Sequence, residues 1–288
     1  MGLFSNNQKE SNINFDALDL KFPLSYDIKQ ETEFYINNSS INHTTTEIEL
    51  NINAFKKLQN GYRTLIELGT HKIIDCQSQY KKLIEFISKF NIPVSELDIE
   101  LNENGIPSKI LNQKNVFEKW IKLRDEEMVS LKNDETMRPI LLGGDKDFSN
   151  TSEMLNKSTM YIFFFPAVYG MRDLSNVRNI KLASQLYQGE KIEFSIRESL
   201  ISISNINTCF LHEANGIYDY DKMRSMYKKG YKQLFSDTKF DYNCSYKATY
   251  EYNLKNGILE RCGAAISEDS MHKRLIYKQV FNIQRNKQ

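Results

Sequence analysis

The chain has 288 residues, of which 40% are hydrophobic and 12% aromatic, enough apolar material for one large core or two ordinary ones. Its 38 Lys and Arg residues balance 37 Asp and Glu residues, so no net field attracts the whole protein to nucleic acid or to an anionic membrane. We therefore predict a folded protein for which nucleic acid is not an expected partner.

Neither a membrane span nor a targeting signal is found in the sequence. The most apolar run, 161–165, ends at Pro166, far short of the roughly 20 apolar residues that a membrane helix needs. The first eight residues lack the basic start and apolar stretch of a secretory signal. We therefore predict a cytoplasmic protein without a membrane span. Four widely separated cysteines without a Cys-x-x-Cys pair are interpreted as reduced thiols: Cys76, Cys209, Cys244 and Cys262.

The amino-terminal region predicts strands and then a helix. Residues 1–30 read as an extended lead-in, and alternating apolar residues over 32–75 predict strands, with Asn60-Gly61 as one of the turns. In 77–90 the apolar residues recur three or four positions apart, which predicts one face of a helix.

A hairpin and a helix with the only tryptophan follow. Apolar residues alternate with acidic ones over 97–101, Asn104-Gly105 supplies a tight turn, and the chain returns over 106–111. Asn112 or Asn115 is expected to cap the next helix, whose apolar stripe places Trp120 on the sheet. The pattern then weakens over 134–158, where Gly143-Gly144 is interpreted as a turn.

The second half repeats this order in outline. Strands are predicted over 182–187, 191–197, 200–206 and 208–211, followed by a helix over 220–235. A hairpin then alternates over 246–266 around Asn256-Gly257, and a last strand is expected over 275–283. We predict two α+β halves, 31–158 and 159–288, which could pack as one domain. An ancient duplication is a further hypothesis.

These patterns predict an α+β fold with a large antiparallel sheet, or two related sheets, faced by long amphipathic helices. Hairpin turns dominate, which argues against a parallel doubly wound sheet. The expected core includes Trp120, Phe117, Ile84, Ile87, Tyr227 and Leu234.

The sequence contains no recognisable catalytic, metal or cofactor motif. His212-Glu213 lacks the second histidine of a zincin helix, and Asn215-Gly216 just after it reads as a turn. The segment 141–146 has two glycines and a lysine without the spacing of a phosphate loop. The four histidines are interpreted as surface or edge residues: His43, His71, His212 and His272. We predict no catalytic residue, no metal ligand and no cofactor.

The tyrosines of the final sheet are the predicted binding residues, because several phenols on one sheet face offer rigid, amphipathic contact area. The predicted set is Tyr246, Tyr250, Tyr252 and Tyr277. Core packing under a helix is the alternative explanation of the same pattern. The basic helix over 222–232 could hold phosphates, but a solvated helix face explains it more simply. Asp98 with Glu100 on one strand face and Asp219 with Asp221 are carboxylate pairs of the kind that a glycosidase needs, and helix capping explains Asp219 or Asp221 more simply.

The segment 97–120, with its Glu103-Asn104-Gly105-Ile106-Pro107 turn and its helix bearing Trp120, resembles a recurring pattern in uncharacterised β-rich proteins of Bacteroidetes-type bacteria. It covers less than a tenth of the chain. The resemblance implies a curved antiparallel sheet with helices on its concave side, as in lipoprotein carriers, some encoded beside toxin or contractile-secretion genes. It transfers no functional residue, and such carriers normally follow a signal peptide or lipobox cysteine that this sequence does not show.

We therefore predict that the chain is a non-enzymatic protein-binding protein, such as an immunity or accessory protein of a bacterial toxin or secretion system. The first alternative is a carrier of an amphiphilic ligand in a curved-sheet cavity. The second is a hydrolase whose residues meet only in space, which would show a cleft with a histidine and two carboxylates. The protein-binding hypothesis expects a shallow, exposed surface rich in Tyr and Asn.

Overall fold

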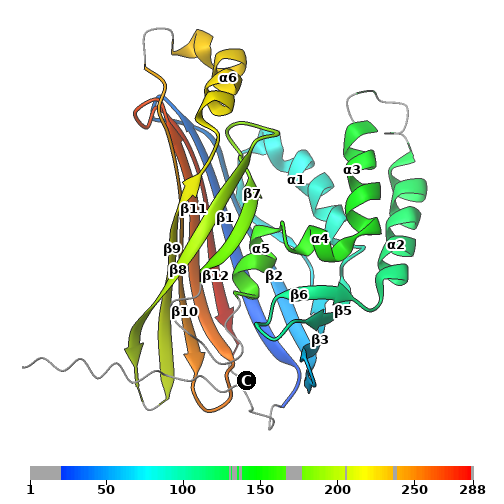
Figure 1. Ribbon diagram of the computed structural model, residues 1–288. Coiled ribbons are helices and arrows are strands. Elements are labelled where there is room, and N and C mark those ends of the chain that lie inside the picture. Colours follow the sequence, from blue (N-terminus) through cyan, green and yellow to red (C-terminus); the bar gives the residue numbers. More distant parts are fainter. Residues whose placement is uncertain are drawn as a thin grey trace, which may run out of the picture.

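The computed structural model describes residues 21–129, 131, 135, 138–166, 177–204, 206–235 and 239–286. In these ranges the chain forms one large antiparallel sheet, with most of the helices gathered over one of its faces (Figure 1). The predicted antiparallel sheet is confirmed, and it is a single sheet rather than two. Most of the predicted lead-in, residues 1–20, lies outside the described residues.

The amino-terminal half of the chain builds one side of the sheet. Alternation of inward and outward side chains sets its strands, as expected for a sheet with one covered face. The strands are β1 (Leu24–Ile36), β2 (Ser39–Leu58), β3 (Gly61–Leu68), β4 (Lys72–Cys76), β5 (Glu96–Leu101) and β6 (Pro107–Ile110). The last part of the predicted lead-in, from Leu24 onward, is therefore strand.

The carboxy-terminal half builds the other side. The two segments predicted over 191–206 are largely one strand, and the strand predicted over 182–187 lies earlier along the chain. The strands are β7 (Arg178–Ala183), β8 (Lys191–Ile203), β9 (Asn207–Ile217), β10 (Tyr242–Asn253), β11 (Leu259–Ser270) and β12 (Leu275–Arg285).

The strand order shows how the two halves meet. Neighbouring strands pair in the order β6-β5-β3-β2-β1-β12-β11-β10-β9-β8-β7, and β4 pairs with β2 beside this path. The chain begins at the centre, steps outward to β6, re-enters at the opposite edge as β7 and returns to the centre as β12. The β1–β12 pair joins the halves along its whole length, from Tyr26 opposite Arg285 to Ile36 opposite Leu275. Their division into domains and their origin by duplication stay predictions.

Both predicted hairpins are confirmed. Residues 97–111 contain β5 and β6, and residues 246–266 lie in the pair β10 and β11. Gly105 and Gly257 have φ angles of 82° and 62°, in the left-handed region that glycine adopts without a steric penalty. The Asn-Gly pairs therefore set these two turns as the sequence indicated.

Most of the helices lie in the crossover between β6 and β7. The longest described helix has 12 residues, shorter than the long helices that the sequence led us to expect. The helices are α1 (Lys81–Ser88), α2 (Gln113–Lys122), α3 (Arg138–Ser149), α4 (Thr151–Leu155), α5 (Thr159–Phe164) and α6 (Tyr220–Gly230). Short turns flank some of them: η1 (Ser78–Tyr80), η2 (Lys89–Asn91), the π-helical η3 (Leu123–Glu127) and η5 (Lys232–Leu234).

The pairs Gly143-Gly144 and Asn215-Gly216 were interpreted as turns but lie inside regular elements, so these predictions were wrong. Gly144 is in α3, where a Cβ atom would come within 2.4 Å of the Trp120 ring. Gly216 is in β9, where a Cβ atom would come within 2.6 Å of Ile192 Cγ2. Each glycine permits a close approach of another side chain to the backbone rather than a change of chain direction.

Three further local predictions need correction. Ile87 and Leu234 were expected in the core but are 55% and 52% exposed. Asn112 stands at the start of α2 without capping it. Its side chain instead accepts a hydrogen bond from Asp98 N and donates one to Glu96 O, which fixes α2 to β5.

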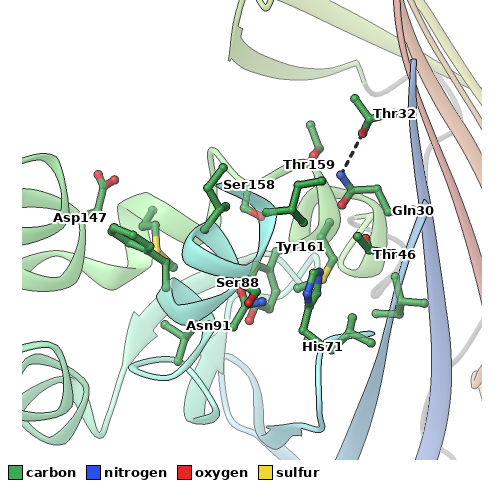
Figure 2. A pocket seen from close by; sticks show the side chains of 18 of the residues that line it. Gln30, Thr32, Thr46, His71, Ser88, Asn91, Asp147, Ser158, Thr159 and Tyr161 are labelled. Carbon is green, nitrogen blue, oxygen red and sulfur yellow. Dashed lines mark hydrogen bonds between the residues drawn. The ribbon is translucent and has the colours of Figure 1, made fainter. Parts of the chain in front are cut away.

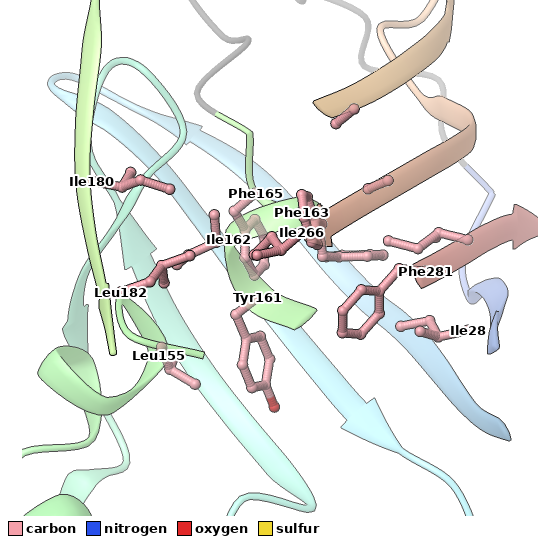
Figure 3. Packing of buried hydrophobic residues seen from close by; sticks show 14 of the residues in the cluster. Ile28, Leu155, Tyr161, Ile162, Phe163, Phe165, Ile180, Leu182, Ile266 and Phe281 are labelled. Atoms are coloured by element: carbon pink, nitrogen blue, oxygen red, sulfur yellow. The ribbon is translucent and has the colours of Figure 1, made fainter. Parts of the chain in front are cut away.

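The apolar run at 161–165 covers most of α5 and the residue after it, and it packs over the centre of the sheet (Figure 3). The Phe163 ring lies 5.1 Å from Tyr246 and 5.3 Å from Phe281, between centroids, and Phe164 lies 5.2 Å from Tyr26. Burial of these large side chains contributes much of the apolar stabilisation. This packing also holds the start of α5 above β1 and β2.

Candidate functional site

The inner faces of β1 and β2 change from apolar to polar along their length. Side chains two residues apart share a face, and the register places Ile28 opposite Ile48, Gln30 opposite Thr46, and Thr32 opposite Thr44. Thr44 and Thr46 are only 8% exposed, so these hydroxyls are covered although they lie on a sheet face that elsewhere is apolar. Two rows of uncharged polar side chains therefore stand beneath the helices.

The helices are held away from this polar part of the sheet by contacts among themselves. Gln113 of α2 donates to Phe148 O at 2.7 Å and accepts from Thr151 N at 3.1 Å, which joins α2, α3 and α4. Trp120 Nε1 donates to Asp145 Oδ1 at 2.8 Å and its ring packs on Phe148, with centroids 4.9 Å apart. These contacts join α2, α3 and α4 into one helical layer.

Between this layer and the sheet lies a cavity of about 610 Å³ (Figure 2). Its volume falls in the range of pockets that hold drug-sized molecules. Hydroxyl and amide side chains from the sheet line it together with isoleucine, phenylalanine and methionine side chains from the helices. Ile87, Ile140 and Asp147 are lining residues that are exposed, and they mark its mouth. The lining is thus both apolar and hydrogen-bonding.

Tyr161 of α5 lines this cavity and carries a buried hydroxyl. The residue is 3% exposed, and its hydroxyl has no hydrogen-bond partner among the residues that the structure describes. Burial raises the pKa of Tyr161, so the phenol is neutral and can donate a proton in a hydrogen bond. Figure 3 shows the ring at the edge of the apolar cluster, with its hydroxyl directed away from Phe163. Leaving such a hydroxyl unpaired costs roughly 1–3 kcal/mol.

His71, in the connection between β3 and β4, is a second lining residue of this kind. Its Nδ1 atom is buried and has no hydrogen-bond partner within the described part of the chain. Burial lowers the pKa of His71 below its ordinary value of 6.5, so the imidazole is neutral at neutral pH. Figure 2 shows His71 and Tyr161 among the side chains that line the cavity.

Charged groups are scarce in this lining. Among the described lining residues there is no lysine or arginine, and Asp147 at the mouth is the sole carboxylate. The remaining polar groups are hydroxyls, amides and one imidazole. This arrangement can hold an apolar body and form hydrogen bonds with it at several points, but it does not offer an ion a partner of opposite charge deep inside.

The predicted tyrosines lie elsewhere. Tyr246, Tyr250 and Tyr252 are at most 1% exposed, beneath α5 and in the sheet layer, and Tyr277 is half-buried. None of them is among the described residues that line the cavity. Burial raises the pKa of Tyr277 to about 12. Their packing accounts for their spacing, and their role in binding stays a prediction.

The other histidines pair with carboxylates away from the cavity. His212, 2% exposed in β9, contacts Glu198 of β8, and His272 Nδ1 lies 2.7 Å from Asp241 Oδ2. His43 Nε2 lies 3.5 Å from Asp75 Oδ2. The buried position of His212 corrects its interpretation as a surface or edge residue, since β9 is paired on both sides. No cluster of three or more His, Cys, Asp or Glu side chains able to hold a metal ion occurs in the described ranges.

Sequence reasoning missed the cavity residues, although a signal was present. Gln30 and Thr32 continue the inward-facing series of Tyr26 and Ile28, and polar residues at core-facing positions of a strand are an exception to binary patterning. The opposite row in β2 shows the same change between Ile48 and Thr46. The helical side of the cavity had no comparable signal, because it depends on how separate helices meet.

No protein-family model matches the sequence, and no curated protein is similar to it. A similar solved structure carries the description "Lipid-protein interactions in lipovitellin", with 7% sequence identity and a TM-score of 0.41. The alignment covers 92% of this chain and 25% of the lipovitellin chain. This chain therefore spans about a quarter of the length of the lipovitellin chain. A likeness at this TM-score supports no inference about ligand or function. No described helix combines the length and the apolar character that crossing a membrane requires.

Proposed function

We propose that the protein binds an amphiphilic small molecule in the cavity between β1, β2 and the helical layer, and so acts as a ligand carrier. The observation that carries this proposal is Tyr161, a residue that lines a cavity of about 610 Å³ and whose buried hydroxyl lacks a partner among the described residues. A bound molecule with a polar group would supply that partner, and its apolar body would cover the isoleucine and phenylalanine side chains of the lining.

The protein-binding prediction finds less support, because three of the four tyrosines chosen for it are buried. A protein partner, a role in immunity or secretion, a bacterial relationship and a cytoplasmic location stay predictions. The hydrolase alternative asked for a histidine and two carboxylates in one cleft. The described lining of the cavity includes His71 and a single carboxylate, Asp147. The carrier hypothesis is therefore the one that the cavity favours.

The proposal is tested by filling the cavity without disturbing the fold. Gly143 of α3 is a lining residue at which an added Cβ atom would meet no other atom within 4 Å. Gly143→Leu adds a side chain at this lining position and replaces glycine by a better helix former. Nile red, an uncharged dye whose emission rises in apolar surroundings, serves as the probe in a fluorescence titration.

We expect the wild-type protein to bind Nile red and Gly143→Leu to bind it about tenfold more weakly, because the leucine competes for the same volume. Gly230→Leu is the matched control. It makes the same substitution at the end of α6, away from the cavity and also in open space. Absence of dye binding by the wild type, or equal loss of binding in both variants, would contradict the proposal.

A further inference from the structure

The charge of the cavity restricts which amphiphile can enter it. Gln30, Thr32, Thr44 and Thr46 present uncharged groups from the sheet, and Thr159 presents one from α5. Of the described lining residues none carries a positive charge, so an anionic head group would lose its hydration without gaining a counter-charge. The carboxylate of Asp147 at the mouth adds repulsion of anions.

The groups that need partners are neutral. Tyr161 has a proton to donate, and a hydroxyl or carbonyl oxygen of a ligand would accept it. The buried Nδ1 of the neutral His71 can accept or donate according to its tautomer, which suits a hydroxyl group on the ligand. The two groups belong to different elements that line the same cavity, Tyr161 to α5 and His71 to the connection between β3 and β4.

Resting on the proposed function, we propose that the cavity selects uncharged amphiphiles bearing hydroxyl or carbonyl groups, such as monoacylglycerols or long-chain alcohols, and discriminates against fatty acid anions. Tyr161 donates a hydrogen bond to the head group, and His71 binds a second oxygen of the same group. The isoleucine and phenylalanine side chains of α1, η2 and α3 contact the hydrocarbon chain of the ligand.

The test compares three probes that share a twelve-carbon chain and differ in head-group charge. They are 1-monolauroylglycerol, laurate at a pH where its carboxyl group is ionised, and dodecyltrimethylammonium, each used below its micellar concentration to displace Nile red. We expect 1-monolauroylglycerol to bind at least about tenfold more tightly than either ion. Tyr161→Phe raises the Kd for 1-monolauroylglycerol about tenfold and changes the Kd values for the two ions little.

Tyr187→Phe is the matched control, since Tyr187 is a buried tyrosine outside the cavity whose hydroxyl already donates to Ser270 Oγ at 2.8 Å. It leaves all three Kd values unchanged. If laurate or the ammonium probe binds as tightly as the uncharged one, or if Tyr161→Phe weakens all three equally, selection for uncharged head groups is wrong while binding in the cavity stands. If Nile red itself does not bind, the proposed function fails.

Discussion

Two buried polar groups, Glu268 in the carboxy-terminal half and Tyr161 beside the cavity, differ in their hydrogen bonding. In the carboxy-terminal half, Glu268 of β11 is 1% exposed and accepts four hydrogen bonds. The donors are Ser184 Oγ, Gln185 N, Leu186 N and Tyr242 Oη, at 2.6 to 3.3 Å. Beside the cavity, the buried hydroxyl of Tyr161 has no such partner among the described residues.

This difference separates polar groups that stabilise the fold from polar groups placed for a ligand. The Glu268 cluster ties the segment after β7 to the sheet, so its polar atoms are used within the protein. A group whose desolvation is not compensated in the folded chain destabilises it, and such exceptions are concentrated at functional sites. The comparison therefore predicts opposite responses to substitutions in the two regions.

The largest effect is expected for Glu268→Ala. It leaves four buried donors without their acceptor, so the free energy of unfolding should fall by about 4 kcal/mol. Urea denaturation measures this loss. Glu193→Ala, which removes an exposed carboxylate paired with Lys181, is the control and should change stability by less than about 0.5 kcal/mol. A loss below about 1 kcal/mol for Glu268→Ala would show that the cluster is not a structural one.

A smaller but sharper contrast is expected between two tyrosine-to-phenylalanine substitutions. Tyr187→Phe removes a paired hydroxyl and should lower the free energy of unfolding by about 1 kcal/mol. Tyr161→Phe removes an unpaired one and should leave stability unchanged or raise it by up to about 1 kcal/mol. Thermal unfolding of the ligand-free proteins measures both. Equal losses in the two variants would mean that Tyr161 is structural like Tyr187.

The smallest expected effect concerns the pH dependence of stability at His71. Because burial lowers its folded-state pKa below 6.5, the unfolded chain binds a proton in a pH range where the folded chain does not. The contribution of the neutral imidazole is complete above about pH 6.5 and is lost as the pH falls toward the folded-state pKa. Relative to His71→Gln, the wild type should lose less than about 1 kcal/mol over this range. If the difference in unfolding free energy between the wild type and His71→Gln does not change with pH, the burial of the His71 imidazole is contradicted. Tyr161 and Asp147 are the other titratable groups in the described lining.

Local patterns in the sequence were sufficient to predict the hairpins but not the cavity. Strand alternation and the glycines at positions 105 and 257 are encoded by neighbouring residues, and both hairpins followed from them. Gly143-Gly144 could not be interpreted locally, since the reason for Gly144 is the Trp120 ring, 24 positions earlier in the chain. The tyrosines of β10 were chosen for their spacing, which packing under α5 produces equally well.

The candidate site was beyond sequence reasoning for a similar reason. Its sheet side is a change of residue type on one face of β1 and β2, which period-two alternation can reveal. Its other side depends on α1, α3 and α5 meeting over that face, and no local signal reports such an arrangement. The proposal depends on the Tyr161 hydroxyl lacking a hydrogen-bond partner among the described residues, and only the folded structure shows this.

A crystal structure of the protein with 1-monolauroylglycerol tests the central claim most directly. We predict electron density for the acyl chain of 1-monolauroylglycerol within the cavity, and a head-group oxygen within hydrogen-bond distance of Tyr161 Oη. Density for the probe at another site, or a Tyr161 hydroxyl that remains out of reach of it, would contradict the account.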